Sequence, residues 1–246
     1  MGRIRYHQIA DELRAAVMSG RYRAGQVLPS EATLCDEHHA SRVTIRKALE
    51  ILRSEGLLES RQGYGWFVAA ESLPQELAGL LTIEQQLASA GRRSERRVLD
   101  FRYVDAPPDV VAVLGPRVLE VRRLALADGD PFARVTVWCR EDLAAPLSKA
   151  AVEGASFLEL VDERPGGARQ TIGAQTVAPA DARLLGIPAG AAVLVVGRVT
   201  HSRSGTPMLV SEHVFPGHLT RFVADLPWVE PNEATSPTGL RLVAEA

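Results

Sequence analysis

The stretch LPSEATLCDEHHASRVTIRKALEILRS, residues 28–54, decides the fold of this chain. Its second half carries apolar side chains at the i, i+3, i+4 and i+7 spacing of one helix face. Ser41 directly precedes this pattern and is a residue type that caps helix starts well. We therefore expect a helix from Ser41 through Arg53 whose buried stripe is Ile45, Ala48, Leu49 and Leu52.

The residues before this helix predict two more helices. Ser30 is a suitable N-cap for a short helix that buries Leu34, and the next turn is expected at residues 38–40. Further upstream, residues 6–19 show helical spacing of apolar side chains, and Gly20 ends the pattern. Two helices joined by a tight turn, after a supporting first helix, are typical of a helix-turn-helix.

The outer face of the third helix carries cations close to the helix start. Arg42 and Arg46 lie one turn apart, with Thr44 and Lys47 nearby. Cations at a helix N-terminus oppose the helix dipole, which favours anions there. A phosphate bound at the same place reverses that balance. The position of these arginines therefore indicates insertion into a DNA major groove.

The residues after the third helix predict a β-hairpin. Gly56 ends the helix, and two extended segments, 57–61 and 66–68, flank the sequence Gln-Gly-Tyr-Gly at 62–65. Glycines at Gly63 and Gly65 permit positive φ and a close approach of the backbone to a partner. We interpret the hairpin as a wing, with Arg61 near its tip placed against phosphate or in a minor groove.

Residues 5 to 68 contain a dense series of characteristic positions: Tyr6, Gln8-Ile9-Ala10, Leu13-Arg14, Ser19-Gly20, Tyr22, Gly25, Leu28-Pro29-Ser30-Glu31, Ser41-Arg42, Thr44-Ile45-Arg46, Ala48-Leu49, Glu55-Gly56-Leu57, Gly63, Gly65 and Phe67-Val68. Through these residues the N-terminal part resembles the GntR family of bacterial regulators. The resemblance implies DNA contacts by the recognition helix and by the wing, at Ser41, Arg42, Thr44, Arg46, Arg61 and Gly63.

The rest of the chain predicts a second domain of mixed α and β structure. We place the first domain at residues 1–70, a linker at 71–78 and the second domain at 79–246. Thr82 and Gln85 have the spacing of a capping box at a helix start. An internal repeat follows, in which a short helix precedes a β-hairpin. Its copies begin at Ala106-Pro107-Pro108-Asp109 and at Ala178-Pro179-Ala180-Asp181. Two such units predict one antiparallel sheet with helices on its face and a ligand pocket between the copies.

The second part also contains three short motifs besides the repeat: Leu80-Leu81-Thr82, Arg123-Leu124 with Leu126-Ala127-Asp128-Gly129 and Pro131, and Gly205-Thr206-Pro207. With these motifs it resembles the UTRA effector domain of the HutC-like branch of GntR regulators. The resemblance implies a chorismate-lyase-like fold and a small anionic effector. The overall expectation is an α+β protein with an N-terminal winged helix-turn-helix and a C-terminal antiparallel sheet with helices.

Three residues are candidates to hold that effector. Thr82 and Ser156 offer hydroxyls at predicted helix starts, and Arg123 offers a guanidinium for a carboxylate or phosphate. Each also has a purely structural interpretation, as a helix cap or a surface charge. Ala125, Leu209 and Thr220 occupy positions where the resemblance implies arginine, acidic and aromatic side chains. The effector is therefore expected to be anionic but not a typical sugar phosphate.

Composition narrows the class of protein further. Formal net charge is −2, and residues 1–70 hold ten Lys and Arg against eight Asp and Glu, so charge alone does not identify a DNA-binding protein. Cys35 and Cys139 lack the spacing of a disulfide framework or a zinc site, and no cofactor is implied. The longest apolar run, residues 191–196, is too short to span a membrane. We expect a cytoplasmic protein.

These inferences favour a homodimeric DNA-binding regulator that binds double-stranded operator DNA, and specifically a repressor that a small molecule releases from the operator. An orphan DNA-binding dimer without an effector is the first alternative. An enzyme of the chorismate-lyase kind is the second, although such chemistry needs several anion-binding arginines in one pocket and only Arg123 is placed.

Overall fold

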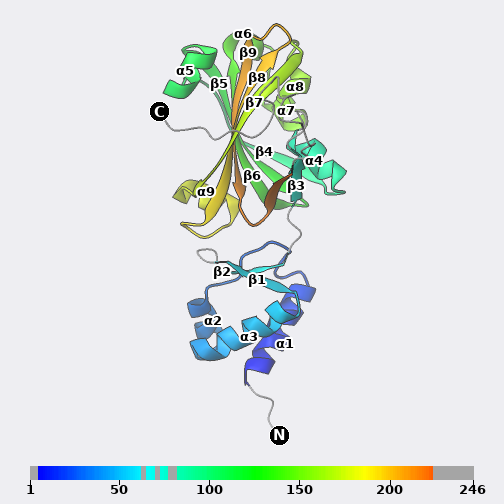
Figure 1. Cartoon of the computed structure of the whole chain (residues 1–246), viewed down its shortest axis with the longest axis vertical. Helices are drawn as coiled ribbons and strands as arrows, with labels where there is room; N and C mark the ends of the chain where they lie inside the picture. The colour runs from blue at the N-terminus through cyan, green and yellow to red at the C-terminus, as the bar shows by residue number, and fades with distance from the viewer. Residues whose placement is uncertain (1–4, 62–64, 70–72, 77–81, 224–246) are drawn as a thin grey trace, which may run out of the picture.

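The structure is a computed structural model of the 246-residue chain, and it describes residues 5–61, 65–69, 73–76 and 82–223. Two parts follow one another along the long axis, a small helical part at the N-terminus and a larger part built on a sheet (Figure 1). The expected α+β architecture is confirmed. Among the described residues, no helix is both long and apolar enough to cross a bilayer.

The N-terminal part is a winged helix-turn-helix. Its helices pack around one apolar core that includes Ile9, Leu34 and Leu49, together with Trp66 from the hairpin. The helices and the hairpin strands lie within about two residues of the bounds expected from apolar spacing. The elements are α1 (Arg5–Met18), α2 (Glu31–His38), α3 (Arg42–Ser54), β1 (Leu58–Arg61) and β2 (Gly65–Val68).

Side-chain caps fix where α2 and α3 begin. Ser30 Oγ accepts a hydrogen bond from the Thr33 N–H at 3.1 Å, and Ser41 Oγ accepts one from the Thr44 N–H at 3.2 Å. Between the two helices, His39 takes the left-handed conformation with φ 47°. The caps and this turn set the direction of α3, which we expected to be the recognition helix.

The larger part contains a six-stranded antiparallel sheet with the order β4-β5-β6-β9-β8-β7. Within the part of the chain that the structure describes, the outer edges of β4 and β7 pair with no further strand. The strands are β4 (Ser94–Asp105), β5 (Arg117–Ala127), β6 (Asp130–Arg140), β7 (Pro165–Thr176), β8 (Ala192–Ser202) and β9 (Pro207–Pro216).

The sheet consists of two copies of one β-α-β-β unit. The first copy is β4, α5 (Pro108–Leu114), β5 and β6, and the second is β7, α9 (Pro179–Leu185), β8 and β9. The copies join where β6 pairs with β9. Each helix reaches across this seam, since α5 contacts β9 and α9 contacts β6. The internal repeat read from the sequence therefore corresponds to a repeat in the fold.

The two faces of the sheet carry different helices. Figure 1 shows α5 and α9 on one side, and α4, α7 and α8 on the other. The main core, which includes Leu119, Val135 and Phe215, lies under the second group. The remaining helices are α4 (Ile83–Ser89), α6 (Glu141–Ala144), α7 (Lys149–Gly154) and α8 (Phe157–Leu160).

A short strand lies within the stretch that the sequence suggested as a linker without core. This strand, β3 (Leu73–Glu76), pairs in parallel with β10 (Thr220–Val223) near the end of the described chain. A parallel pair between segments so distant in sequence has no local turn signal, so it could not be predicted from the sequence. As a result, the chain leaving β2 is attached to the larger part within five residues of Val68.

Candidate DNA-binding surface and effector cavity

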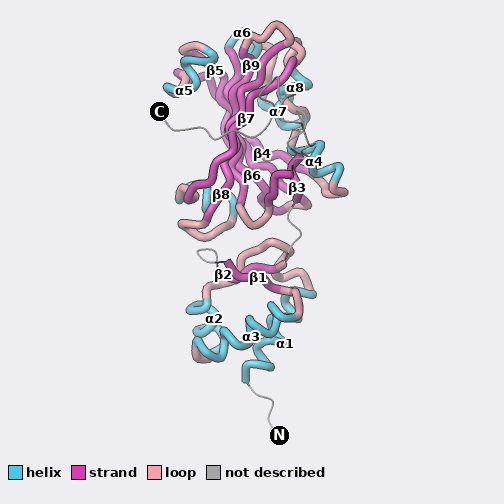
Figure 2. The backbone as a smooth tube through the Cα atoms, viewed as in Figure 1, coloured by secondary structure: helices cyan, strands magenta, loops and turns pink. Residues whose placement is uncertain are grey.

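The outer face of α3 lies on an open hollow of about 820 Å3. Arg42 and Lys47 are exposed there, as predicted, and Arg46 lies one turn further along the helix. The hollow points away from the larger part, because the β1–β2 hairpin lies between the three helices and the large sheet (Figure 2). Its lining residues are Tyr6, Glu31, Arg42, Val43, Arg46, Lys47, Glu50, Ile51 and Ser54.

Arg46 is held in place by Glu31 of α2. Its Nε and Nη2 atoms donate to the two Glu31 carboxylate oxygens at 3.2 and 3.1 Å. The indole N–H of Trp66 donates to the same carboxylate at 3.1 Å. Burial raises the pKa of Glu31, but the hydrogen bonds from Trp66 and Arg46 outweigh it and hold that pKa below its ordinary value. One carboxylate therefore connects α2, α3 and β2.

The hydroxyl groups expected to contact DNA also support the helix start. Ser41 Oγ and Thr44 Oγ1 lie 2.8 Å apart, and Ser41 caps α3. The helix runs for 13 residues, so its first N–H groups and dipole add to an anion-binding surface. The ammonium of Lys47 lies 5.6 Å from the centre of the Tyr6 ring, which directs its stem along the helix.

The wing is described only in part. Gly65 begins β2 with φ 84°, a conformation that favours glycine. Arg61 pairs with Gly65 at the end of β1, and its side chain lies outside the described residues, as does Gly63. DNA contacts by Arg61 and Gly63 stay predictions.

Sequence reasoning missed two residues of this surface. Val43 is 67% exposed between the two arginines, and an apolar side chain there suits the methyl group of a thymine. Its exposed helical position next to Arg42 was the available signal. Glu31 was quoted only as part of a motif, and its contact with Arg46 depends on how α2 packs on α3.

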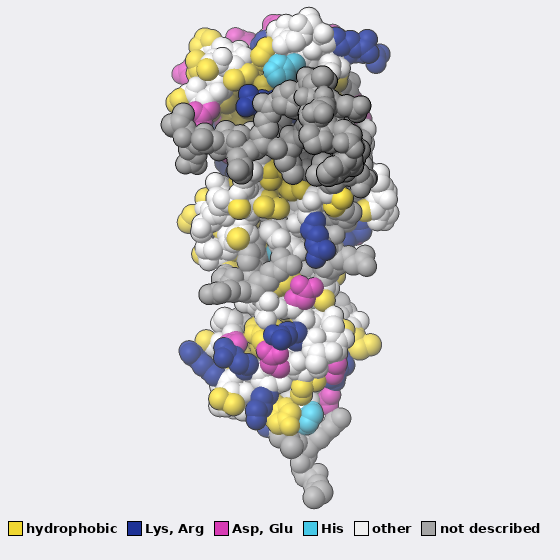
Figure 3. Space-filling model, in the orientation of Figure 1, with side chains coloured by type: hydrophobic (Ala, Val, Ile, Leu, Met, Phe, Trp, Pro, Cys, Tyr) yellow, Lys and Arg dark blue, Asp and Glu magenta, His cyan; other side chains and the backbone are white. Residues whose placement is uncertain are grey.

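Charge on this part of the molecule is mixed. On the face shown in Figure 3, the Lys and Arg side chains of the N-terminal part alternate with Asp and Glu and form no continuous basic field. This agrees with the small excess of Lys and Arg over Asp and Glu in residues 1–70 of the sequence. The candidate DNA-binding surface is therefore identified by residue positions on α3 and not by bulk charge.

In the larger part, Thr82 and Ser156 line the same cavity, of about 450 Å3. The cavity lies beside α4, α8 and the start of β7, and not over the seam between the copies, where we expected a pocket. Both residues also cap helices: Thr82 Oγ1 accepts from the Gln85 N–H at 3.2 Å, and the Ser156 N–H donates to Glu159 at 2.8 Å. The lining residues are Thr82, Gln85, Ser156, Leu158, Glu159, Pro165, Gly166 and Gly167.

Arg123 is separate from this cavity lining and is not the surface charge considered above. Its side chain faces the main core from β5, the residue is 7% exposed, and Nη1 has no hydrogen-bond partner among the described residues. The positive charge of Arg123 interacts with the carboxylate of Glu84 on α4, and Glu84 directly precedes the cavity residue Gln85. Burial opposes ionisation of Glu84, but its hydrogen bond from Arg96 and the charge of Arg123 lower its pKa to about 2.

A buried histidine shares this environment. His213 of β9 lies 3.0 Å from Ser211 Oγ and stacks on Phe215. Burial, followed by the charges of Arg198 and Arg123, lowers the pKa of His213 to about 3. Its imidazole is neutral at physiological pH. The alternating pattern of β9 indicates that His213 and Phe215 share one face of the sheet. The pairing of β9 with β6, which brings His213 close to Arg123, could not be predicted from the sequence.

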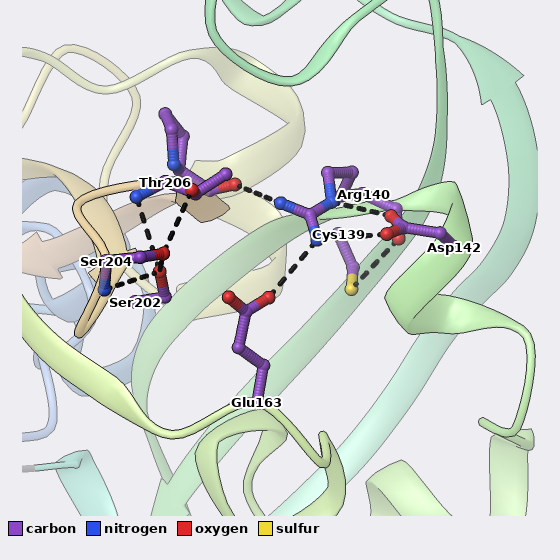
Figure 4. Close-up of polar contacts among 8 residues, drawn as sticks. Cys139, Arg140, Asp142, Glu163, Ser202, Ser204 and Thr206 are labelled. Atoms are coloured by element: carbon purple, nitrogen blue, oxygen red, sulfur yellow. Dashed lines mark hydrogen bonds and ion pairs between the residues drawn. The ribbon is translucent and has the colours of Figure 1, made fainter.

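Arg140 makes several polar contacts close to the start of β7 (Figure 4). Its guanidinium donates to Asp142 at 2.6 Å, to the Pro207 carbonyl at 3.0 Å and to Glu163 at 3.1 Å. Glu163 lies two residues before β7, whose first residues line the cavity. Gly166 is also needed there, since a Cβ at that position would meet the Ser202 carbonyl oxygen at 2.6 Å.

Two family models match the chain in the same order as these two parts. The model of the bacterial regulatory proteins of the gntR family matches residues 5–68, and the UTRA domain model matches residues 89–221. The chain belongs to the GntR family and carries a UTRA domain. Regulators of this family bind operator DNA, and UTRA domains bind small-molecule effectors.

Individual relatives agree with this assignment. The chain is 34% identical over 212 residues to the HTH-type transcriptional regulator Rv0792c of Mycobacterium tuberculosis, covering 82% of this chain and 78% of the relative. It is 28% identical over 225 residues to the HTH-type transcriptional repressor NagR of Bacillus subtilis, covering 89% and 93%. The fold resembles that of PhnF from Mycobacterium smegmatis, with TM-score 0.58, 21% identity and coverage of 89% and 98%. This GntR protein is therefore a transcription regulator and not a lyase.

Proposed function

We propose that this GntR protein is a homodimeric repressor that a small carboxylate releases from its operator. It would act in the cytoplasm, where the bacterial chromosome lies. The observation that carries the DNA-binding part is the exposed row Arg42, Val43 and Arg46 at the start of a capped helix. Relatives named as repressors, NagR among them, support the direction of regulation.

The recognition surface offers both kinds of base contact. Arginine pairs with guanine through two hydrogen bonds, and valine fits against a thymine methyl group. Arg46 still has Nη1 available beyond its bonds to Glu31, and Glu31 limits the orientations it can adopt. The N-terminal half of α3 would thus lie in the major groove, and Glu50 and Ser54, in the C-terminal part of the helix, would lie further from the bases.

Substitution of the two arginines tests this proposal. DNA duplexes selected by the protein from a random-sequence pool would serve as operators in a gel-shift assay. Arg42→Ala with Arg46→Ala should weaken binding by about 100-fold or more, since each base-contacting arginine contributes about 1–3 kcal/mol. Arg53→Ala is the matched control, because Arg53 is exposed on the last turn of the same helix and pairs only locally with Glu50. Equal binding by the double variant and the control would refute the assigned surface.

The two open edges of the sheet differ in a way that supports dimerisation through β7. β4 carries charged residues along its length, which protect an edge from pairing. β7 has the sequence PGGARQTIGAQT, with one charge, and most of it is exposed. A 12-residue edge with a single charge invites antiparallel pairing with a second copy of itself. A dimer also brings two recognition helices to a two-fold operator.

The buried arginine supports a carboxylate effector. A guanidinium desolvated at Arg123 with Nη1 unpartnered among the described residues is costly unless an anion binds it. Arg198, half-buried on β8, adds positive charge on the same face of the sheet. Ala125 and Leu209 supply no further polar group, which favours a carboxylate with an apolar body over a sugar phosphate.

Thermal-shift measurements with named probes test this part. Benzoate should raise the melting temperature and glucose 6-phosphate should not, because a ligand at about 100 times its Kd adds about 2.7 kcal/mol of stability. Arg123→Met should abolish the benzoate shift, while Arg117→Met, an exposed site on the same strand, should keep it. A shift with glucose 6-phosphate alone would overturn the carboxylate assignment.

An orphan dimer without an effector is a second candidate. The observation that favours it is that Thr82 Oγ1 already serves as a helix cap at the cavity, and that the Ser156 N–H is already bonded to Glu159. In that case neither probe changes the melting temperature, and operator binding is the same with and without them.

A further inference from the structure

The larger part of the molecule contacts the winged helix through a buried histidine. His218 lies in the turn between β9 and β10 and is 3% exposed. Its Nε2 atom lies 2.9 Å from the carbonyl oxygen of Gly25, which belongs to the loop between α1 and α2. A carbonyl oxygen only accepts hydrogen bonds, so Nε2 carries the hydrogen and donates it. The two parts are thus joined by a directional bond.

The same imidazole covers an aromatic side chain of the wing. The Phe67 and His218 ring centroids are 4.9 Å apart. Trp66 and Val68 face the helices and belong to their core, whereas Phe67, between them on β2, faces the other way. Phe67 is nonetheless only 2% exposed. The outer face of the hairpin is therefore built to be covered by the larger part.

A second attachment lies directly beside the first. β10 begins at Thr220, two residues after His218, and pairs with β3, the strand that follows the wing in the chain. One attachment would leave the winged helix free to swivel, but two attachments a few residues apart limit its rotation. The exposed ion pair of Arg23 with Asp130, 3.0 Å long, is a weaker third contact.

We propose that His218 is a positioning residue for operator recognition, which fixes the direction of each recognition helix relative to the sheet and so selects the spacing between operator half-sites. The inference rests on the proposed dimer. Each α3 is tied through its own hairpin and His218 to the sheet of its protomer, so the distance and angle between the two helices become properties of the dimer. Without the histidine, each winged helix would still read a half-site but would adapt to other spacings.

Operator spacing provides the test. Duplexes with the selected palindrome would be compared with the same palindrome carrying two extra central base pairs, which turn one half-site by about 70° because a turn takes 10–10.5 base pairs. A single half-site gives the reference affinity. Wild-type protein should lose about 100-fold on the longer spacer, since loss of bivalent binding removes about 10²–10⁴ in affinity. His218→Ala should lose less than about fivefold on it and match wild type on the single half-site.

A conservative variant separates positioning from folding. His218→Gln keeps a side-chain N–H near the position of Nε2 and should restore most of the spacing preference. It also decides the question if the alanine variant fails to fold. Asp130→Asn, which removes only the exposed ion pair, should behave as wild type. Sedimentation would confirm that all variants remain dimers.

Four outcomes would count against the proposals, and they are distinguishable. The inference is overturned if His218→Ala keeps the wild-type spacing preference, or if it loses affinity equally for the single half-site. Wild-type protein that binds a palindrome without any spacing preference overturns it too, and leaves the DNA-binding regulator intact. Wild-type protein that binds as a monomer removes the proposed dimer itself.

Discussion

The two halves of the sheet have the same plan but bury different side chains. In the first half, α5 is held by apolar contacts of Val110 and Leu114 with Val118. In the second half, α9 adds a buried ion pair: Asp181 accepts two hydrogen bonds from Arg134 of β6, at 3.1 and 2.8 Å. The edges differ as well, since β4 carries several charged residues and β7 carries one.

The comparison distinguishes residues that specify the plan shared by both halves from residues that serve one half or the seam alone. The shared pattern of helix start, strand, turn and strand specifies the repeat. The Arg134–Asp181 ion pair lies at the seam, where the two halves meet. The β7 edge, with its single charge, and the buried His213 belong to the second half. Four predictions test this distinction, from the largest expected effect to the smallest.

Breaking the ion pair should have the largest effect on stability. Asp181→Ala leaves the buried Arg134 guanidinium with Glu212 and Thr136 alone, and removal of one partner of a buried pair costs about 3–5 kcal/mol. The double variant Arg134→Met with Asp181→Leu should be nearly as stable as wild type, because it removes both charges. Urea unfolding measures both. A double variant as unstable as the single one would show that the charges themselves are required.

An acidic residue on β7, the edge strand with a single charge, should have the next largest effect. Ile172 lies near the middle of β7 and is 37% exposed, so pairing about a two-fold axis places it close to its own copy. Ile172→Asp should raise the dimer dissociation constant by about 30- to 100-fold, since like charges brought together cost several kcal/mol. Tyr103→Asp on β4, where Tyr103 is 39% exposed, should leave the dimer unchanged in sedimentation equilibrium. The reverse result would assign the dimer to the other edge.

Acid should destabilise the protein through His213. The folded-state pKa of His213 is about 3 and an unfolded histidine titrates near 6.5, so the unfolded chain binds the proton more readily. This contribution is complete well above pH 6.5 and is lost as pH falls toward 3; at pH 5.5 the loss is about 1.4 kcal/mol. His213→Leu should flatten the melting temperature between pH 6.5 and 5. An unchanged slope would mean that other groups cause the acid sensitivity.

The hairpin turns should show the smallest difference. Asp128 of the β5–β6 turn has φ 52° and accepts a hydrogen bond from the Arg93 N–H at 2.8 Å. Asp128→Ala should cost about 1 kcal/mol, because alanine adopts the left-handed conformation less readily than aspartate. In the β8–β9 turn the positive φ falls on Gly205, so Ser204→Ala should cost less than about 0.5 kcal/mol. Thermal unfolding of the two variants gives the comparison.

The sequence predicted the local features of the fold well. Capping residues such as Ser41 and Thr82 lie within three residues of the groups they bond, and the amphipathic spacing of α3 is visible in the chain itself. Exposure of Arg42 and Arg46 followed from that spacing. The internal repeat also predicted the sheet, because each copy contains its own helix and hairpin.

The features that were missed depend on contacts between distant segments. Arg134 meets Asp181 because α9 crosses the seam, and the two are 47 residues apart. Arg123 is buried because α4 covers its face of the sheet, so its interpretation as a surface charge was wrong. The pairing of β3 with β10, and the contact of His218 with Gly25, join segments from opposite ends of the chain. Local spacing contains no information about such pairs.

The cover that His218 gives to Phe67 has a consequence for synthesis of the protein. The winged helix closes its own core within its first 68 residues, so it can fold while the ribosome is still at work. Phe67 then stays uncovered until His218 has been made, about 150 residues later, which takes about 10–30 s at bacterial elongation rates. During that interval the nascent chain presents an apolar patch and a DNA-binding helix together.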